Sequence, residues 1–360
     1  MAVLLGVDTG GTYTDAVLVE DDKTVLASAK SLTTRSDLAQ GIGASVAAVI
    51  DRAGVDPASI AMAALSTTLA TNALVEGHGG RVALVYIGFN RKDLATHGLT
   101  DALAGDPLIV LEGGHTHAGV EAAPLDGVAL SDWLAGLVGV SAFAVASQFG
   151  TRNPAHELKA AEIIRAATGA PVSCSHHLSA KLNGPKRALT ALLNARLIGM
   201  IDRLIGRAQD ALIASGVNAP LMVVRGDGAL ISAAMARERP IETILSGPAA
   251  SIVGARWLTG AEHALVSDIG GTTTDIAVLR DGRPTIDPAG AQVGPYRTLV
   301  EAVALRTSGL GGDSEVHFIA EGLKSGVTLG PRRVLPVSLL AVEASDIVHA
   351  TLERQLGNPI

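Results

Sequence analysis

The chain has 360 residues, of which 48% are hydrophobic and only 2% aromatic, and its formal net charge is −7. This length suits two hydrophobic cores better than one. The acidic balance, with no block of Lys and Arg in the sequence, argues against a nucleic-acid backbone as the main ligand. The single cysteine, Cys174, excludes an internal disulfide and fits a reducing compartment.

The apolar segments do not predict membrane insertion. The N-terminal MAVLLGVD has no basic region before its apolar run, so it does not resemble a signal peptide. The longest apolar stretch, residues 137–146, is far too short to span a bilayer. We therefore expect a cytoplasmic protein with no membrane partner.

The first 80 residues predict a three-stranded meander, a helix, and a fourth strand that leads into a second helix. Apolar residues recur at helical spacing over 37–53, and Gly54 ends this helix. Ser66, Thr67 and Thr68 follow the fourth strand and are residue types that cap helices; the capped helix carries Asn72. The predicted strands are 3–8, 16–20, 24–29 and 60–65.

Residues 81–175 alternate between apolar strands and helices. This alternation is typical of β-α-β units and predicts a mostly parallel sheet that is covered on both faces. The predicted strands are 81–87, 108–111, 141–147 and 171–175, and the predicted helices are 90–97, 129–137 and 154–168.

A long helix is predicted over about 185–215, because one apolar stripe runs from Leu189 to Leu212. Pro185 suits its first turn and Gly216 its C-terminal end. The later predicted elements are a strand at 221–224, helices near 229–237 and 248–258, a hairpin at 276–286 and a glycine-rich turn at 309–312.

One eight-residue motif occurs twice, as DTGGTYTD at 8–15 and as DIGGTTTD at 268–275. Glycines let backbone N–H groups approach phosphate oxygens, threonines add donors, and an aspartate can hold hydrated Mg²⁺. A β-hairpin with a Gly-Gly turn would explain a single copy. Because the aspartates and threonines are repeated as well, we favour phosphate binding by two similar lobes that close on one nucleotide.

These motifs resemble the phosphate loops of the actin-like ATPase superfamily, and the chain is similar to the A-type subunit of the hydantoinase/oxoprolinase family. The resemblance implies an α/β, actin-like ATPase (ribonuclease H-like) fold with two pseudo-repeated lobes. The lobes are expected at 1–255, with an α/β segment at 81–180, and at 256–360, where the second lobe is short or incomplete. The segments that carry the resemblance are GVDTGGTYTD (6–15), STTLATNALVE (66–76), RVALVYIGF (81–89), TILSGPAASIVGA (243–255) and DIGGTTTDIAVL (268–279).

The resemblance also implies ATP and Mg²⁺ as cofactors. Asp8 and Asp268 would hold the water ligands of Mg²⁺ or orient the nucleophile. Gly311, Gly312 and Asp313 resemble a further turn in the second lobe of these ATPases, with an ordinary loop as the alternative. The residues expected to cradle the phosphates or brace the turns are Gly10, Gly11, Thr12, Thr14, Asp15, Gly270, Gly271, Thr272, Thr273 and Asp275.

Thr67, Thr68 and Asn72 lie at a strand-to-helix junction from which they could reach a substrate. A pure capping role for the two threonines is equally consistent with their position. The helix that begins at ILSGPAA (244–250) is expected to cross between the lobes at a hinge, because its small residues allow close packing. A tightly packed core helix would show the same spacing.

Family members couple ATP hydrolysis to the opening of a cyclic amide such as a hydantoin or 5-oxoproline, and some relatives serve in ATP-dependent carboxylases. An unstrained lactam carbonyl is a poor electrophile, so we expect an ATP-dependent hydrolase that activates this carbonyl by phosphorylation. A small-molecule kinase on the same fold and a non-catalytic or regulatory ATP-binding subunit stay open as alternatives. A B-type subunit or a second copy of the chain is the expected protein partner.

Three features differ from the family pattern. Residues 182–187 read LNGPKR where the family often has Glu-Tyr-Glu-Arg, and residues 225–228 read RGDG where Ser-Asn-Gly-Gly is common. The chain ends at Ile360, whereas A-type subunits continue for hundreds of residues, which indicates a truncated chain, a partner that completes the site, or a shortened relative. Lys186 and Arg187 begin the long helix, where cations are disfavoured, so they suit an anionic ligand or plain surface charge.

The cysteine and several histidines raise a separate hypothesis, a transition-metal site. Cys174, His176 and His177 lie at one predicted strand end, and His115 and His117 lie at another. Parallel strands end on a common edge, so these side chains could meet. Hydrogen-bonded loop histidines are the simpler interpretation, and adjacent residues on a strand point to opposite faces, which argues against a metal shared by His176 and His177.

Overall fold

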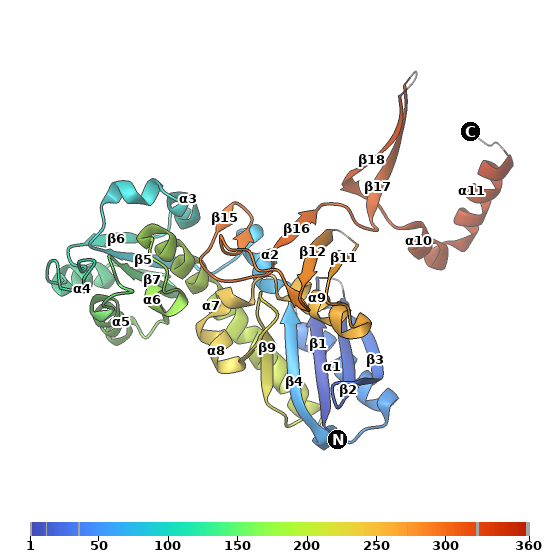
Figure 1. Cartoon of the computed structure of the whole chain (residues 1–360), viewed down its shortest axis with the longest axis horizontal. Helices are drawn as coiled ribbons and strands as arrows, with labels where there is room; N and C mark the ends of the chain where they lie inside the picture. Colours follow the sequence, from blue (N-terminus) through green and yellow to red (C-terminus); the bar gives the residue numbers. More distant parts are fainter. Residues whose placement is uncertain (1, 12, 35–36, 272, 322–323, 358–360) are drawn as a thin grey trace. The chain divides into compact units, whose positions relative to one another are not determined.

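The structure is a computed structural model that describes residues 2–11, 13–34, 37–271, 273–321 and 324–357. The chain divides into two compact units (Figure 1). The first unit comprises Met1–Gly254 and Ile286–Val303, and the second comprises Ala255–Thr285 and Ala304–Ile360. Segment Ile286–Val303 therefore returns to the first unit after the second has begun.

A six-stranded sheet forms one part of the first unit, in the order β10-β9-β4-β1-β2-β3. Strand β1 pairs antiparallel with β2 and parallel with β4, which places the ends of β1 and β4 side by side. This confirms the predicted meander and the buried fourth strand. The strands are β1 (Val3–Thr9), β2 (Tyr13–Glu20), β3 (Thr24–Leu32), β4 (Ile60–Thr67), β9 (Leu221–Val224) and β10 (Leu230–Ser232).

Helix α1 (Leu38–Ala53) covers one face of this sheet and contacts β1, β2 and β3. Asp37 accepts a hydrogen bond from Ala39 N at its start, and Gly54 ends it in the left-handed conformation. A Cβ at Gly41 would lie 3.0 Å from both Thr14 Oγ1 and Leu32 O, so a glycine at this position permits the close approach of helix and sheet. Helix α2 (Leu69–Val75) directly follows β4.

A second, four-stranded sheet in the same unit has the order β6-β5-β7-β8, with all its pairs parallel. This confirms the parallel sheet predicted for residues 81–175. Its central strands β5 and β7 are buried throughout, as expected for strands with helices on both faces. The elements are β5 (Val82–Ile87), α3 (Leu99–Leu103), β6 (Leu108–Leu111), α4 (Gly127–Ala135), β7 (Ala142–Ser147), α5 (Ala155–Thr168), β8 (Val172–Cys174) and α6 (Ser175–Leu178).

Helix α7 (Gly184–Ala214) joins the two sheets of the first unit. It packs against β5, β7 and β8 of one sheet and against α1, which covers the other sheet. Asn183 accepts a hydrogen bond from Lys186 N and so caps the helix. The helix itself begins at Gly184, one residue before the predicted start. The long apolar stripe is confirmed, since Leu189, Leu197 and Leu204 are all buried.

The predicted secondary structure is wrong in three places. Residues 90–97 form only a 3-10 helix at Arg91–Ala95, because His97 and Gly98 adopt left-handed conformations that end it. The predicted helix 229–237 begins later, as α8 (Ala233–Glu238), because residues Leu230–Ser232 pair with β9. Strand β8 ends at Cys174, so the argument from strand alternation does not apply to His176 and His177, which lie on helix α6.

The second unit contains a sheet in which β11 pairs with β12, and β12 also pairs with β13 and β16. Helix α9 (Ser246–Thr259) spans the boundary between the units, and β14 (Gln292–Val293) and β15 (Tyr296–Arg297) belong to the first. The other elements are β11 (Ala264–Ile269), β12 (Thr274–Arg280), β13 (Arg283–Pro284), β16 (Leu305–Ser308), β17 (Ser314–Glu321), β18 (Lys324–Arg333), α10 (Val337–Glu343) and α11 (Ser345–Gly357).

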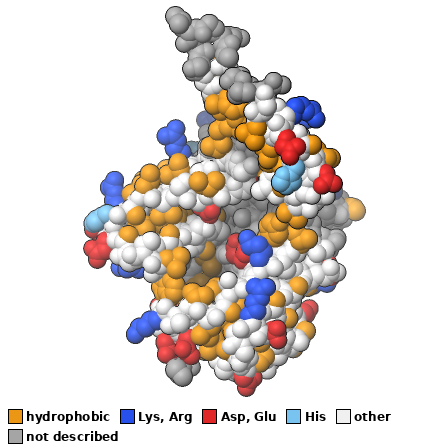
Figure 2. Space-filling view, turned by 90° about the vertical axis from the view of Figure 1, so that its right-hand side faces the viewer, with side chains coloured by type: hydrophobic (Ala, Val, Ile, Leu, Met, Phe, Trp, Pro, Cys, Tyr) orange, Lys and Arg blue, Asp and Glu red, His pale blue; other side chains and the backbone are white. Residues whose placement is uncertain are grey.

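Apolar side chains are exposed on the second unit. On β11, Leu265 is 72% exposed and Ile269 is 70% exposed, and Phe318 on β17 is also exposed. The space-filling view in Figure 2 shows many apolar side chains at the surface on one face of the molecule. Within the described ranges, the helices are all too short or too polar to cross a lipid bilayer.

Candidate functional site

The first copy of the repeated motif forms the tight turn between β1 and β2. Asp8 lies opposite Asp15, and Thr9 lies opposite Thr14. The turn closes with a hydrogen bond of 3.0 Å from Gly10 N to Tyr13 O. The motif is therefore a strand–turn–strand unit, as predicted.

Strand alternation separates the side chains of this motif onto two faces of the sheet. Asp8 pairs in register with Ser66 of β4, and Thr9 pairs with Thr67. Because successive residues of a strand point to opposite faces, the carboxylate shares one face with Ser66 and the Thr9 hydroxyl shares the other with Thr67. The carboxylate of Asp8 and the hydroxyl of Thr9 therefore lie on opposite faces of the sheet.

The carboxylate face carries Asp8 and Asp15. The Ser66 hydroxyl donates a hydrogen bond of 2.5 Å to Asp8 Oδ1, and Lys30 Nζ lies 3.3 Å from Asp15 Oδ1. Both aspartates line a cavity of about 490 Å³ on this face, together with Lys30 and Arg52. The anchored Asp8 carboxylate offers oxygen ligands of the kind that Mg²⁺ prefers.

The hydroxyl face carries the residues predicted to contact a substrate. Thr67 Oγ1 accepts a hydrogen bond from Leu69 N, the first residue of helix α2, and Thr68 is the N-cap residue. Asn72 follows Thr68 by one helical turn, and its Nδ2 lies 3.4 Å from Thr68 Oγ1. Thr67, Thr68 and Asn72 line a small cavity of about 150 Å³ together with the turn glycines Gly10 and Gly11. The structure thus brings the first turn and the predicted substrate residues together.

The start of helix α9 lies against the strand-to-helix junction of β4 and α2. Ser246 Oγ donates to Thr67 O at 2.9 Å and accepts from Thr67 N at 3.3 Å. A Cβ at Gly247 would lie 3.3 Å from Thr68 Cγ2, which shows how closely the two segments approach. The small residues at the start of this helix therefore have a packing role next to the candidate site.

The second copy of the motif repeats the geometry of the first. Asp268 lies opposite Asp275, and Ile269 lies opposite Thr274. Gly270 N donates to Thr273 O at 2.9 Å, which matches the closing hydrogen bond of the first turn. Two hairpins in the same register with the same closing bond form a structural repeat.

The predicted third turn contacts the second hairpin within the second unit. Gly312 N donates to Gly270 O at 3.0 Å, and Asp313 N donates to Gly271 O at 2.8 Å. Gly311 N donates to Ser314 Oγ, which holds the turn itself. The third turn and the second hairpin, both expected to contribute to nucleotide binding, are therefore in contact. Thr12 and Thr272, also predicted to cradle phosphates, lie outside the described residues.

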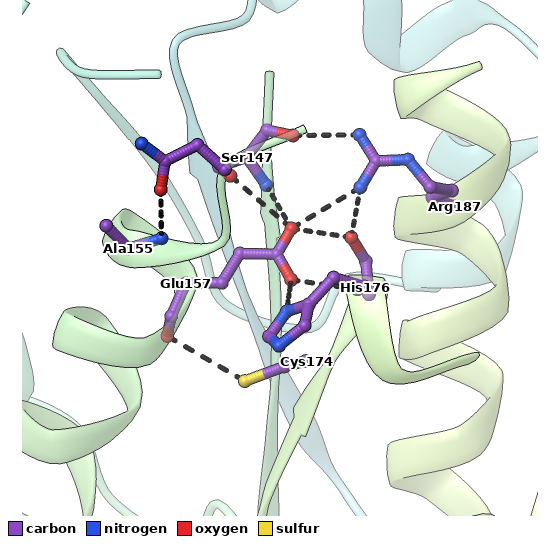
Figure 3. A network of polar contacts seen from close by, with 8 residues as sticks. Ser147, Ala155, Glu157, Cys174, His176 and Arg187 are labelled. Carbon is purple, nitrogen blue, oxygen red and sulfur yellow. Dashed lines mark hydrogen bonds and ion pairs between the residues drawn. The ribbon is translucent and has the colours of Figure 1, made fainter. Parts of the chain in front are cut away.

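A buried polar network that the sequence analysis missed is centred on Glu157 of α5 (Figure 3). One carboxylate oxygen accepts from Ser147 N at 2.9 Å and from Ser175 Oγ at 2.6 Å, and Arg187 Nη1 lies 3.4 Å away. The other oxygen accepts from His176 N at 2.9 Å and from His176 Nδ1 at 2.7 Å. Arg187 is itself buried, so it serves this network and not the surface role considered above.

The network determines the charge states of its members. Burial raises the pKa of Glu157, but hydrogen bonds from His176 and Ser175 more than offset this effect, and the net pKa lies below its usual value. Burial, with a smaller contribution from Glu157, raises the pKa of the Cys174 thiol to about 12. Glu157 is therefore an anion and Cys174 a protonated thiol at neutral pH.

The predicted meeting of cysteine and histidine side chains is only partly observed. Ligand atoms of Glu157, Cys174 and His176 all lie within 4.8 Å of one another. His115 instead packs against His156, with ring centroids 4.4 Å apart. Since protein donors already satisfy the Glu157 carboxylate, the contacts favour a structural ion-pair network over a metal site.

The fold and the sequence together define the family. The structure matches that of ATP-dependent caprolactamase from Pseudomonas jessenii with a TM-score of 0.74 and 28% identity, over 92% of this chain and 51% of the other. The sequence patterns of the hydantoinase/oxoprolinase N-terminal region and of hydantoinase/oxoprolinase match residues 4–168 and 187–338. The chain belongs to the hydantoinase/oxoprolinase family.

Two curated relatives resemble the chain along most of its length. The alpha subunit of caprolactamase from Pseudomonas jessenii is 28% identical over 91% of this chain and 50% of its own length. The gamma subunit of acetophenone carboxylase from Aromatoleum aromaticum is 28% identical over 91% of this chain and 49% of its own length. The chain thus spans about half the length of the curated relatives it matches.

Proposed function

We propose that the protein uses ATP to open a cyclic amide and that both DxGGTxTD hairpins bind the phosphates of one ATP on an actin-like ATPase fold. The observation that carries the proposal is the common register of the hairpins, in which Asp8 faces Asp15 and Asp268 faces Asp275. Each turn offers backbone donors and carboxylates, the groups that phosphoryl transfer requires. The resemblance to ATP-dependent caprolactamase supports the use of ATP.

Asp8 and Asp268 are the proposed holders of Mg²⁺. Ser66 fixes the Asp8 carboxylate by its short hydrogen bond, and carboxylate oxygens are ligands that suit the ion or its waters. When bound, Mg²⁺ would neutralise phosphate charge. In the same proposal Gly10, Gly11, Gly270 and Gly271 donate backbone hydrogen bonds to the phosphates, Thr12, Thr272 and Thr273 add hydroxyls, and Asp15 and Asp275 brace the turns. Thr14 was expected to join them, but its side chain is fully buried and its hydroxyl lies 2.9 Å from Thr33 Oγ1, so it has a structural role.

The proposed chemistry overcomes the stability of the amide. The amide oxygen takes the γ-phosphoryl group as ADP leaves, which makes the ring carbon a better electrophile. Water adds to this carbon, the ring C–N bond breaks, and a second water hydrolyses the resulting acyl phosphate to carboxylate and phosphate. Thr68 and Asn72, at the cavity beside the first turn, are the side chains proposed to orient the amide.

A role in an ATP-dependent carboxylase is the second candidate function. It is favoured by the similarity to the gamma subunit of acetophenone carboxylase, which equals the similarity to caprolactamase in identity. In that case the same activation by phosphorylation would serve a ketone or bicarbonate in place of an amide. The two functions differ in the product, so product analysis separates them.

A partner subunit is part of the proposal. Both curated relatives are described as subunits. The exposed Leu265 and Ile269 lie on one face of β11 and offer apolar surface that a second chain could cover.

The test is an ATPase assay on the chain with and without hydantoin, 5-oxoproline, ε-caprolactam or acetophenone with bicarbonate, with and without a co-expressed B-type subunit. Ring opening in step with ADP release supports the hydrolase, and a carboxylated ketone supports the carboxylase. A stable phosphorylated substrate would identify a kinase instead. Failure to bind ATP in every combination would overturn the proposal.

A further inference from the structure

Four strands of the first unit place polar side chains in one row beside the first motif turn. Ser66 of β4 pairs in register with Asp8 of β1, and Asp8 pairs with Asp15 of β2. Asp15 pairs in turn with Lys30 of β3. Residues that lie opposite one another on paired strands point to the same face of the sheet. The row therefore presents a hydroxyl, two carboxylates and an ammonium group on the carboxylate face.

The Lys30 ammonium contacts a residue of the turn as well as the row. Its Nζ lies 3.3 Å from Asp15 Oδ1 and 5.0 Å from the centre of the Tyr13 ring. Tyr13 belongs to the turn, because its carbonyl oxygen accepts the closing hydrogen bond from Gly10 N. The Lys30 side chain is 58% exposed and lines the 490 Å³ cavity together with Asp8. Lys30 thus brings a positive charge to the turn at which ATP phosphates are proposed to bind.

The side chain of Lys30 can reach a group that is held at Asp8. Neighbouring strands lie about 4.8 Å apart, so the two backbones are separated by about 10 Å. The ammonium group already lies at Asp15, on the strand between them. Because lysine carries its charge on a flexible four-carbon chain, a change of rotamer is enough to bring it to an oxygen beside Asp8.

The second hairpin shows that this positive charge is not needed to hold the turn. Asp275 is the counterpart of Asp15, and it pairs in register with Thr307 of β16. Thr307 Oγ1 donates a hydrogen bond of 2.5 Å to Asp275 Oδ1. A neutral hydroxyl therefore braces the second turn, although Asp268 faces Asp275 there just as Asp8 faces Asp15. Because an exposed ion pair also adds little stability, the charge of Lys30 indicates a further role.

The other cationic residue among the described lining residues of the cavity is less suited to this role. Arg52, in the last turn of α1, donates from Nη1 to Ser28 O at 2.8 Å. Ser28 pairs with Val17, two residues further from the turn than the pair of Asp15 and Lys30. Arg52 is thus anchored further along the strands, and Lys30 is the cation beside the turn.

We propose that Lys30 is a catalytic residue whose ammonium group binds the γ-phosphoryl group of ATP during its transfer. This inference rests on the proposed function and adds a residue to its site. The bond from the γ-phosphorus to the β,γ-bridging oxygen breaks, and a bond from the same phosphorus to the amide oxygen forms. Lys30 exchanges Asp15 for the phosphoryl oxygens and keeps its proton throughout. Its charge offsets the negative charge on those oxygens.

Equilibrium binding tests the contact without turnover. Calorimetric titration of the full chain with adenylyl imidodiphosphate, a non-hydrolysable ATP analogue, is compared with titration with ADP, both in the presence of Mg²⁺. Lys30→Met keeps most of the length of the side chain and removes the charge. This variant should bind the analogue about tenfold more weakly than the parent and ADP within about twofold, because only the analogue carries a γ-phosphate.

Turnover gives a second measure of the same contact. Lys30→Met should lower the kcat for ADP release by about 100-fold, and Lys30→Arg, which keeps the charge, should stay within about tenfold of the parent. Lys159→Met is the matched control, because Lys159 is another exposed lysine in an ion pair, 3.1 Å from Glu162. It should change neither nucleotide binding nor the rate.

The outcomes separate this inference from the proposed function. Equal weakening of the analogue and ADP would assign Lys30 a purely structural role, and that result or unchanged binding of both overturns the inference. Amide opening by Lys30→Met at the parent rate also overturns it and leaves the proposed function standing. Selective loss of the analogue in a protein that opens no cyclic amide keeps Lys30 at the γ-phosphate and removes the proposed substrate. A parent that binds neither nucleotide overturns both.

Discussion

The Ser66 hydroxyl donates a 2.5 Å hydrogen bond to Asp8 across the parallel pair of β1 and β4. The bond joins the first residue of the repeated motif to the first residue of the segment STTLATNAL (66–74). A fixed carboxylate has less freedom to lose when it takes up a metal, so this contact prepares Asp8 for its proposed role.

The first prediction concerns the two motif aspartates. Asp8→Asn and Asp268→Asn should each reduce the ATPase rate by roughly 100-fold, because each removes a charge proposed to lie near the metal and the transferring phosphate. The rate is measured as ADP release at saturating ATP. Asp51→Asn, on the exposed surface of α1, is the matched control and should keep the parent rate. Two fully active motif variants would show that the site is assigned wrongly.

The second prediction concerns Ser66. Ser66→Ala should leave the fold intact but lower kcat about tenfold and raise the Mg²⁺ concentration needed for half-maximal activity, since a hydrogen bond to a charged group contributes about 1.5–3 kcal/mol. A magnesium titration of the ATPase rate measures both effects. Ser45→Ala removes another buried hydroxyl, which binds Ile42 O within α1, and should change neither quantity.

The third prediction concerns the buried network of Figure 3. Glu157→Gln leaves the Arg187 guanidinium buried without its counter-ion, which should lower the free energy of unfolding by about 3–5 kcal/mol. Urea denaturation followed by circular dichroism measures the change. Glu162→Gln, on the same helix but in an exposed ion pair with Lys159, should cost less than about 1 kcal/mol. Equal midpoints for the two variants would show that the network does not stabilise the fold.

The fourth prediction is the pH dependence of this stabilisation. The pKa of Glu157 is lower in the folded protein than its reference value of 4.5, so its ionised form stabilises the fold. This contribution is complete above about pH 4.5 and is lost as the pH falls through the folded pKa. The difference in unfolding free energy between the parent and Glu157→Gln should therefore be constant from pH 7 to pH 5 and shrink below that range. A difference that grows with acidity would contradict the assignment.

The fifth prediction concerns Cys174. The thiol is buried and its pKa is raised to about 12, so very little reactive thiolate exists at pH 8. Reaction with iodoacetamide should be at least about 100-fold slower in the native protein than in urea. Since the chain has one cysteine, the mass change reports this site alone. Rapid labelling of the native protein would show that the strand end around Cys174 opens readily.

The repeated motif could be read from the sequence because its structure is local. Each turn is closed by a hydrogen bond between residues three positions apart, and the strands on either side pair with each other. Strand alternation then follows from the period of two, so the division into a carboxylate face and a hydroxyl face is also implicit in the order of residues. The parallel sheet and the long helix were predictable for the same reason, from apolar periodicity.

Contacts between distant segments were decided by the tertiary structure alone. Glu157 looks like an ordinary polar residue of a surface helix, and only packing brings it to Ser175 and Arg187, 18 and 30 positions away. Leu230–Ser232 is a strand because β9 offers it a partner, against the local preference for helix. The buried Thr9 hydroxyl, which has no partner among the described residues, likewise depends on what surrounds it, since whether a buried polar group finds a partner is a property of the packed interior and not of the local sequence.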